Sequence, residues 1–153
     1  VAEIADIREE LIQTGYIKQK YRNKKQKMLP PEKYQAEDGT IILVGKNNLQ
    51  NEQVSFKLSR RGDLWFHVKD IPGSHVLITG NANPSDETIT FAGELAAYFS
   101  KARYSNLVQV DVLDVKKLHK PTGTAPGFVT YDREKTIRVT PDESVIKSRK
   151  IGK

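Results

Sequence analysis

The sequence predicts an α+β fold: a single domain with a mostly antiparallel sheet packed with helices, preceded by an N-terminal helix. The chain has 153 residues, which is the length of one ordinary domain. Its apolar, strand-like segments are mostly joined by short turns, and short connections favour antiparallel pairing. The expected helices and strands follow one another unevenly, with no repeat of fixed period. No Gly-x-Gly-x-x-Gly or Walker motif is present, which argues against a nucleotide-binding parallel sheet.

Residues 1–27 are expected to form the end of a coiled-coil helix and then a basic linker. Apolar side chains recur at helical spacings of three and four, at Val1, Ile4, Ile7 and Leu11. Gly15 supplies a stop, because glycine tolerates the left-handed conformation that ends many helices. Residues 18–27 then carry six basic side chains and no acid. Since the chain starts with Val1, we expect a piece of a longer protein.

The body of the domain is expected over residues 34–142. Asp38-Gly39 predicts a hairpin between residues 34–36 and 41–44. A short helix is expected over 49–59, and strands over 64–68 and 75–79.

The second half of the body starts with a helix that Ser85 can cap and that runs to about Ala102. An alternating strand is expected over 107–115. A hairpin should then pair residues 128–131 with 135–140, and residues 143–153 are expected to be a basic C-terminal tail.

The segment from Asp63 to His75 carries the most unusual side chains. On a strand, Trp65, His67 and Lys69 share one face, while the other face is apolar. An indole, an imidazole and an ammonium in a row can stack on a base and contact phosphate, which suits irregular RNA. The alternative is that Trp65 belongs to the core and only Lys69 is exposed.

Two turns could add polar contacts to that row. Ser74 and His75 follow Pro72-Gly73, where exposed backbone N–H groups can cradle an anion; the alternative is a tight turn without a ligand. Asn47 and Asn48 lie in an amide-rich loop that can contact bases, phosphate or sugar, although such amides are as often turn and cap residues.

Composition narrows the classes of function. The 25 Lys and Arg outnumber the 19 Asp and Glu, and their clustering favours a polyanion partner, although solvated surfaces and tails cluster charge too. With no Cys and three His, we expect no metal site. No set of Ser, His and acid is visible, so we expect no catalytic residues, and we expect no cofactor. No apolar stretch approaches the about 20 residues of a membrane span, so no membrane insertion is expected, and no signal peptide is recognised. Arg61-Gly62-Asp63 spells an integrin-recognition tripeptide, but it abuts a predicted strand.

Several motifs together resemble the RNA-binding module of the NFACT family. They are Gly45-x-Asn47-Asn48-x-Gln50-Asn51, Asp63-x-Trp65-Phe66-His67-x-Lys69-Asp70-x-Pro72-Gly73-Ser74-His75-Val76, Ser100-Lys101-Ala102-Arg103, and Pro126-Gly127-Phe128-Val129 with Lys135-Thr136-Ile137. The resemblance covers about residues 1–142. Lys46 stands where the family usually has Arg, and Glu52 where it usually has Asp. Lys keeps the charge but loses the bidentate fork.

The resemblance implies a non-catalytic module of a cytoplasmic, ribosome-associated quality-control factor. Such factors bind the stalled large ribosomal subunit and tRNA and support alanine tailing of nascent chains. The expected contact residues are Asn47, Asn48, Trp65, His67, Lys69, Ser74, His75, Lys101 and Arg103. The alternative implied by the same family is an adhesin module that binds host fibronectin or fibrinogen, displayed at the cell surface without a signal peptide.

Overall fold

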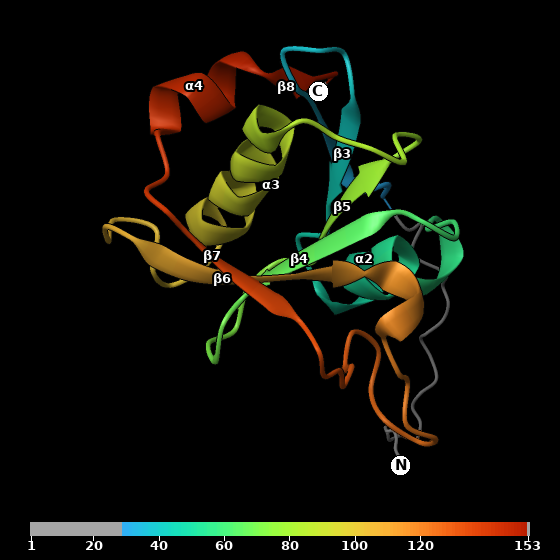
Figure 1. Cartoon of the computed structure of the whole chain (residues 1–153). Helices are drawn as coiled ribbons and strands as arrows, with labels where there is room; N and C mark the ends of the chain where they lie inside the picture. The colour runs from blue at the N-terminus through green and yellow to red at the C-terminus, as the bar shows by residue number, and fades with distance from the viewer. Residues whose placement is uncertain (1–28, 153) are drawn as a thin grey trace.

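The computed structural model describes residues 29–152, and one seven-stranded sheet organises them (Figure 1). All strand pairs are antiparallel, in the order β7-β6-β4-β5-β3-β2-β8. The strands are β2 (Glu32–Gln35), β3 (Ile41–Val44), β4 (Leu64–Val68), β5 (Val76–Thr79), β6 (Val108–Asp114), β7 (Lys135–Val139) and β8 (Lys150–Ile151). The predicted α+β class with a mostly antiparallel sheet is confirmed.

Short helices connect the strands. They are α2 (Asn48–Glu52), which continues as the π-helical turn η1 (Gln53–Lys57), α3 (Asp86–Tyr98), the 3-10 turn η2 (Val115–Lys117) and α4 (Glu143–Ser148). The Ser85 side chain caps α3 as expected, accepting a hydrogen bond from the Thr88 backbone N–H at 3.2 Å. No helix among the described residues is long and apolar enough to cross a membrane.

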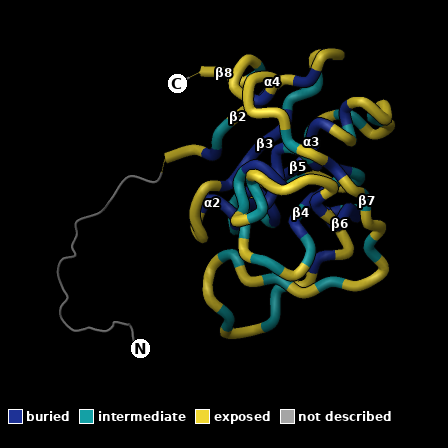
Figure 2. The backbone as a smooth tube through the Cα atoms, turned by 90° about the vertical axis from the view of Figure 1, so that its left-hand side faces the viewer, coloured by how far each residue is buried: buried dark blue, intermediate teal, exposed yellow. Residues whose placement is uncertain are grey.

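Helix α3 covers one face of the sheet. Its buried side includes Phe91, Ala92 and Leu95, which pack on alternate residues of β4 such as Phe66 and Val68. Those two strand residues are fully buried. Figure 2 shows the buried stretches gathered where β3, β4 and β5 run through the centre of the domain.

A second, smaller core covers the opposite face. Trp65 of β4 and Leu77 of β5 lie there under Val54 of the η1 turn. Val129 and Tyr131, from the segment between η2 and β7, close over the same side chains. Both faces of the sheet are therefore covered at β4. This coverage limits how much of Trp65 and His67 reaches solvent.

One expectation about the C-terminal part was wrong, and the predicted tail contains ordered elements. Strand β7 pairs with β6 rather than with residues 128–131, and Thr130 instead bridges to His119. The basic tail is folded: α4 and β8 lie in it, and Ile146 is buried among the core residues that face α3. A six-residue helix is too short to reveal its one buried position by periodicity. The expected N-terminal helix and basic linker, residues 1–27, lie outside the described residues.

Candidate nucleic-acid interface

Five of the predicted contact residues surround one hollow, which we call the basic hollow. Its cavity volume is about 380 Å³, and it lies where the start of α2, the turn between β4 and β5 and the segment after α3 meet. Its lining residues are Lys46, Asn47, Asn48, Asn51, Pro72, Gly73, Ser74, Phe99, Ser100, Lys101 and Arg103. Segments more than 50 residues apart in the sequence thus bring the predicted Asn47, Asn48, Ser74, Lys101 and Arg103 together.

The amide-rich loop is held rigidly against the sheet. Asn47 caps α2 by accepting a hydrogen bond from the Gln50 backbone N–H at 2.9 Å. Asn51 accepts one from the His75 backbone N–H at 3.0 Å. Gly45 makes this approach possible, because a Cβ there would lie 2.8 Å from the Asn51 backbone nitrogen. The exposed Asn48 is thereby presented from a fixed position.

Three cations and no carboxylate line the basic hollow. The Arg103 guanidinium lies 4.1 Å from the Tyr98 ring centroid, and its Nε donates to the Tyr98 carbonyl at 2.8 Å. The Lys46 ammonium lies 4.2 Å from the Phe99 centroid. Among residues 29–152, Lys101 and Arg103 form no ion pair, so their charge is available to an anion.

Three of the remaining predicted residues, Trp65, His67 and His75, line a neighbouring cavity, which we call the aromatic hollow. Its cavity volume is about 410 Å³, and it shares Pro72 with the basic hollow. Its lining residues are Trp65, His67, Asp70, Ile71, Pro72, His75, Gly127, Phe128, Val129 and Tyr131. Eight of the nine predicted residues therefore divide between two adjoining cavities, and Lys69 lines neither of them.

The expectation that Trp65 exposes its ring to a base was wrong. Its side chain is fully buried, and its indole Nε1 donates to the Ser55 hydroxyl at 2.9 Å. The Ser55 oxygen lies 2.6 Å from His75 Nδ1. The side chains of β4 do alternate between the two faces of the sheet, as predicted. The second core, however, covers the face that was expected to reach solvent.

Burial keeps both imidazoles of the aromatic hollow neutral at physiological pH. Desolvation lowers the pKa of His75 to about 3, and it also lowers the pKa of His67. The two ring centroids are 5.5 Å apart and nearly perpendicular. His67 lies parallel to Trp65, at a centroid distance of 5.8 Å. Neutral rings attract phosphate weakly, so the expected phosphate contact through these histidines is not supported.

Lys69 also has a different setting from the one expected. Its ammonium lies 2.8 Å from Asp111 and 3.2 Å from Glu134. The hydrogen bond to Asp111 is the main reason that the pKa of Lys69 is raised. Asp111 is buried and also accepts a hydrogen bond from the Tyr131 hydroxyl at 2.6 Å. Lys69 therefore neutralises buried acid and is not free to contact phosphate.

Sequence reasoning missed three candidate contact residues. Lys46 lines the basic hollow, Phe128 forms part of the aromatic hollow and is 52 % exposed, and Tyr104 follows Arg103 with 86 % exposure. An exposed aromatic side chain beside a cation is a common platform for a base. The sequence could have indicated Tyr104, because it directly follows Arg103. It could not have indicated that Phe128 is exposed, because the expected hairpin placed this residue on a strand.

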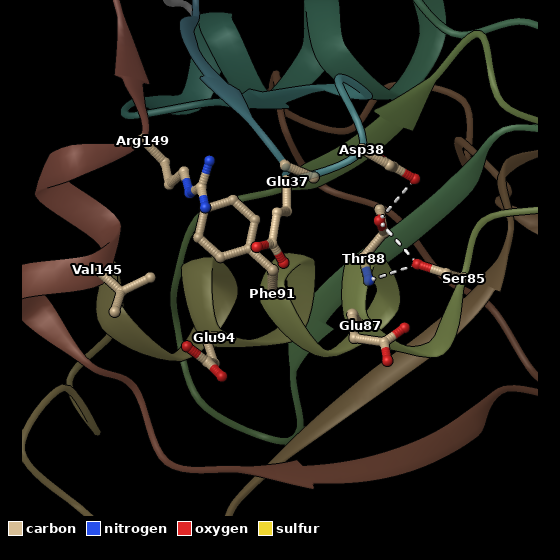
Figure 3. Close-up of a pocket in the computed structure, with 10 residues that line it drawn as sticks. Glu37, Asp38, Ser85, Glu87, Thr88, Phe91, Glu94, Val145 and Arg149 are labelled. Carbon is tan, nitrogen blue, oxygen red and sulfur yellow. Dashed lines mark hydrogen bonds between the residues drawn. The ribbon is translucent and has the colours of Figure 1, made fainter.

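A third cavity has the opposite character (Figure 3). It has a volume of about 410 Å³ and lies between α3, α4 and the turn after β2. Glu37, Asp38, Glu87 and Glu94 line it, with Arg149 as its one cation. Such a cavity repels phosphate, so it is a poor candidate for contact with RNA. No group of three or more potential metal ligands occurs among the described residues.

Comparison with known proteins identifies the family. The family model "NFACT protein RNA binding domain" matches residues 32–130. The solved structure of the C-terminal of the fibronectin/fibrinogen-binding protein from Streptococcus suis is 66% identical, with a TM-score of 0.84. That match covers 97% of this chain and 61% of the solved one.

Curated relatives are much longer than this chain. The Rqc2 homolog RqcH of Streptococcus suis is 66% identical over 152 residues, which is 99% of this chain and 28% of that protein. The Rqc2 homolog RqcH of Bacillus subtilis is 48% identical over 97% of this chain and 27% of its own length. The Ribosome quality control complex subunit 2 of Schizosaccharomyces pombe is 36% identical over 58% of this chain and 9% of its own length. On the family match, the chain belongs to the NFACT RNA-binding domain family.

Proposed function

We propose that this chain is the non-catalytic RNA-binding module of a ribosome quality-control factor that works in the cytoplasm. In this proposal it contacts ribosomal RNA of the stalled large subunit and tRNA, and it supports C-terminal alanine tailing of the nascent chain. The names of its relatives support the cellular role. The chain spans about a quarter of the length of the bacterial relatives, so tailing itself would require the rest of such a protein.

The observation that carries the proposal is the basic hollow. Lys46, Lys101 and Arg103 converge on it without a carboxylate in its lining, and the amides of Asn47 and Asn48 stand beside them. Cations bind the phosphate backbone, and amides can hydrogen bond to sugar, phosphate or base edges. Exposed Tyr104 adds a ring next to the same segment.

The side chains that could serve general acid–base chemistry support binding rather than catalysis. The pKa of His75 is lowered by burial to about 3, so this imidazole takes up no proton near neutral pH. Lys69 is held between Asp111 and Glu134, which keeps its ammonium charged. We therefore assign the two hollows to recognition.

The test is the salt dependence of RNA binding, measured by fluorescence anisotropy with labelled tRNA and a large-subunit rRNA fragment. Lys101→Ala and Arg103→Ala should each weaken binding and lower the log–log salt slope by about 1, because each removes one phosphate contact. Lys69→Ala should leave the slope unchanged, since Asp111 already holds its charge.

Lys117→Ala is the matched control. Lys117 is exposed and lies just after the end of β6. That end pairs with Leu64 at the start of β4, whereas Pro72 follows the other end of β4. We expect it to leave the slope near that of the unaltered chain. Binding that does not change between low and moderate salt would contradict the proposal.

An adhesin module is the second candidate, and its support is the fibronectin/fibrinogen-binding name of the Streptococcus suis protein whose structure this chain resembles. A cation-lined hollow flanked by amides is better suited to a polyanion than to a folded host protein, so we favour RNA. Crosslinking in cells separates the two: the RNA proposal expects rRNA and tRNA attached to residues near Lys101. Recovery of an extracellular protein instead would favour the adhesin.

A further inference from the structure

The two adjoining hollows differ sharply in charge. Lys46, Lys101 and Arg103 line the basic hollow, whereas the aromatic hollow has no Lys or Arg in its lining and one carboxylate, that of Asp70. A phosphate placed in the aromatic hollow would meet that carboxylate without a compensating cation. The lining of the aromatic hollow therefore disfavours phosphate and suits a group without negative charge.

The lining of the aromatic hollow suits a flat ring. The exposed ring of Phe128 and the partly exposed rings of His67 and Tyr131 contribute to it, over the buried His75 and Trp65. Burial lowers the pKa of both histidines, so the imidazoles are neutral. A volume of about 410 Å³ falls within the usual range of small-molecule sites and accommodates one nucleobase. Aromatic surfaces of this kind stack on bases.

Asp70 supplies the aromatic hollow with a hydrogen-bond acceptor. Its backbone has φ 63°, a conformation that Asp and Asn tolerate better than most residues. The side chain is exposed, and among residues 29–152 no hydrogen bond or ion pair engages its carboxylate. An ionised carboxylate only accepts hydrogen bonds, so it requires a donor on the ligand.

We infer that the aromatic hollow, walled by His67, Asp70, His75 and Phe128, receives one unstacked nucleobase that carries an exocyclic amino group, from an RNA strand whose phosphates lie in the basic hollow. The inference rests on the proposed function. The strand passes over Pro72, which both hollows share. Cytosine donates from its N4 amino group to Asp70, whereas uracil presents its O4 acceptor at the same place and is disfavoured.

The test compares three RNA 12-mers of equal length and charge: oligo(C), oligo(U) and a 12-mer with tetrahydrofuran in place of every base. Because their phosphates are the same in number, differences in affinity come from the bases. The whole chain should bind oligo(C) about 10-fold more tightly than oligo(U), the effect of one hydrogen bond to a charged group. The tetrahydrofuran 12-mer should bind more weakly than oligo(C).

Asp70→Asn should abolish the preference, because an amide both donates and accepts and can serve either pyrimidine. Asn also tolerates the backbone conformation of residue 70, so the variant folds. Asp86→Asn is the matched control: it removes one exposed negative charge from the first turn of α3 and should keep the preference.

Fluorescence supplies a readout independent of affinity. Trp65 is the single tryptophan of the chain and lines the aromatic hollow. Saturating oligo(C) should change its emission, and the saturating tetrahydrofuran 12-mer should not.

The failures of the two proposals are distinguishable. Equal binding of the three 12-mers, with binding still weakened by Lys101→Ala, would overturn the base site and leave the RNA-binding function standing. A preference for oligo(C) that survives Asp70→Asn would overturn the role of Asp70. No binding of any 12-mer, tRNA or rRNA would overturn the proposed function itself.

Discussion

At the scale of single residues, a buried polar chain links the second core to the aromatic hollow. The Trp65 indole N–H donates to the Ser55 oxygen, and that hydroxyl lies 2.6 Å from His75 Nδ1. Each of these groups is buried, so leaving one without its partner is costly. The tryptophan that first looked like a base platform therefore acts mainly as a structural support for the histidine behind the hollow.

Replacing Trp65 with Phe tests this assignment. The variant keeps an aromatic ring but leaves the Ser55 hydroxyl without its indole donor and leaves space in the second core. The free energy of unfolding should fall by about 2 kcal/mol, measured by urea denaturation followed by circular dichroism. RNA affinity should stay within about twofold. A large loss of RNA affinity without a loss of stability would show that Trp65 contacts RNA directly.

The burial of His75 predicts a dependence of stability on pH. The folded-state pKa is lowered from 6.5 to about 3, so between these values the unfolded chain holds a proton at this ring that the folded chain lacks. Stability therefore falls as the pH drops below 6.5, by about 1.4 kcal/mol per pH unit for this ring alone. Urea unfolding at pH 7, 6 and 5, followed by Trp65 fluorescence, measures the effect.

His75→Gln should remove that share of the pH dependence, because Gln does not titrate. His119→Gln is the matched control, since it replaces an exposed imidazole and leaves His75 in place. An unaltered pH dependence in His75→Gln would show that another group causes it.

The sequence predicted part of the candidate site and could not predict the rest. Asn47, Lys101 and Arg103 were found because amides and cations in turns point to polyanions wherever the chain places them. The setting of Lys69 depends on Asp111, which lies 42 positions away and is buried by pairing of β4 with β6. Periodicity within one strand carries no information about such a partner.

At the scale of elements, the loop between β3 and α2 determines the shape of both hollows. Gly45 lets Asn51 approach closely enough to accept the His75 backbone N–H. On the other side of α2, Glu52 accepts a hydrogen bond from the Gly127 backbone N–H at 2.7 Å, which holds the segment that carries Phe128. A small movement of α2 would therefore change the two hollows together.

Gly45→Ala tests the role of this loop. The new Cβ would lie 2.8 Å from the Asn51 backbone nitrogen, so α2 must shift. Stability should fall by about 2–3 kcal/mol, and RNA affinity should fall as well, measured by thermal denaturation and anisotropy.

Gly62→Ala is the control for Gly45→Ala, because it introduces backbone strain without a steric clash. Gly62 has φ +94°, with nothing within 4 Å of an added Cβ. It should cost about 1–2 kcal/mol through conformation alone and leave RNA affinity unchanged. Equal effects of the two substitutions on RNA affinity would argue against a special role for α2.

Most individual elements could be predicted because their signals are local. Asp38-Gly39 marked the β2–β3 hairpin, and Ser85 marked the start of α3. The pairing of β7 could not be predicted in the same way. Three residues, Asp132 to Glu134, separate it from residues 128–131, yet Lys135–Val139 pairs with β6 because its side chains also pack beneath α3. Tertiary packing outweighed the local turn signal.

At the scale of the whole molecule, the last elements complete the first core. Ile146 of α4 is 1 % exposed, and the Arg149 carbonyl accepts a hydrogen bond from the Gln35 backbone N–H at 2.9 Å. Strand β8 then pairs with β2. A segment whose composition suggested a solvated tail thus contributes to the stability of the domain.

Ile146→Ala should lower the free energy of unfolding by about 2–4 kcal/mol, because it leaves a cavity under α4. Val145→Ala is its neighbouring control: Val145 is 40 % exposed, and the change should cost about 0.5 kcal/mol or less. Urea denaturation of both variants checks the difference. A similar small loss for both would mean that α4 packs loosely.

The pairing of β2 with β8 also has a mechanical consequence. Lys33 faces Ile151, so both ends of the described chain leave the sheet at the same point on its edge. Tension applied between these ends breaks the hydrogen bonds between β2 and β8 one after another rather than all at once. The two-residue β8 should peel away first under low force and release α4, while the strands beneath the two hollows remain paired.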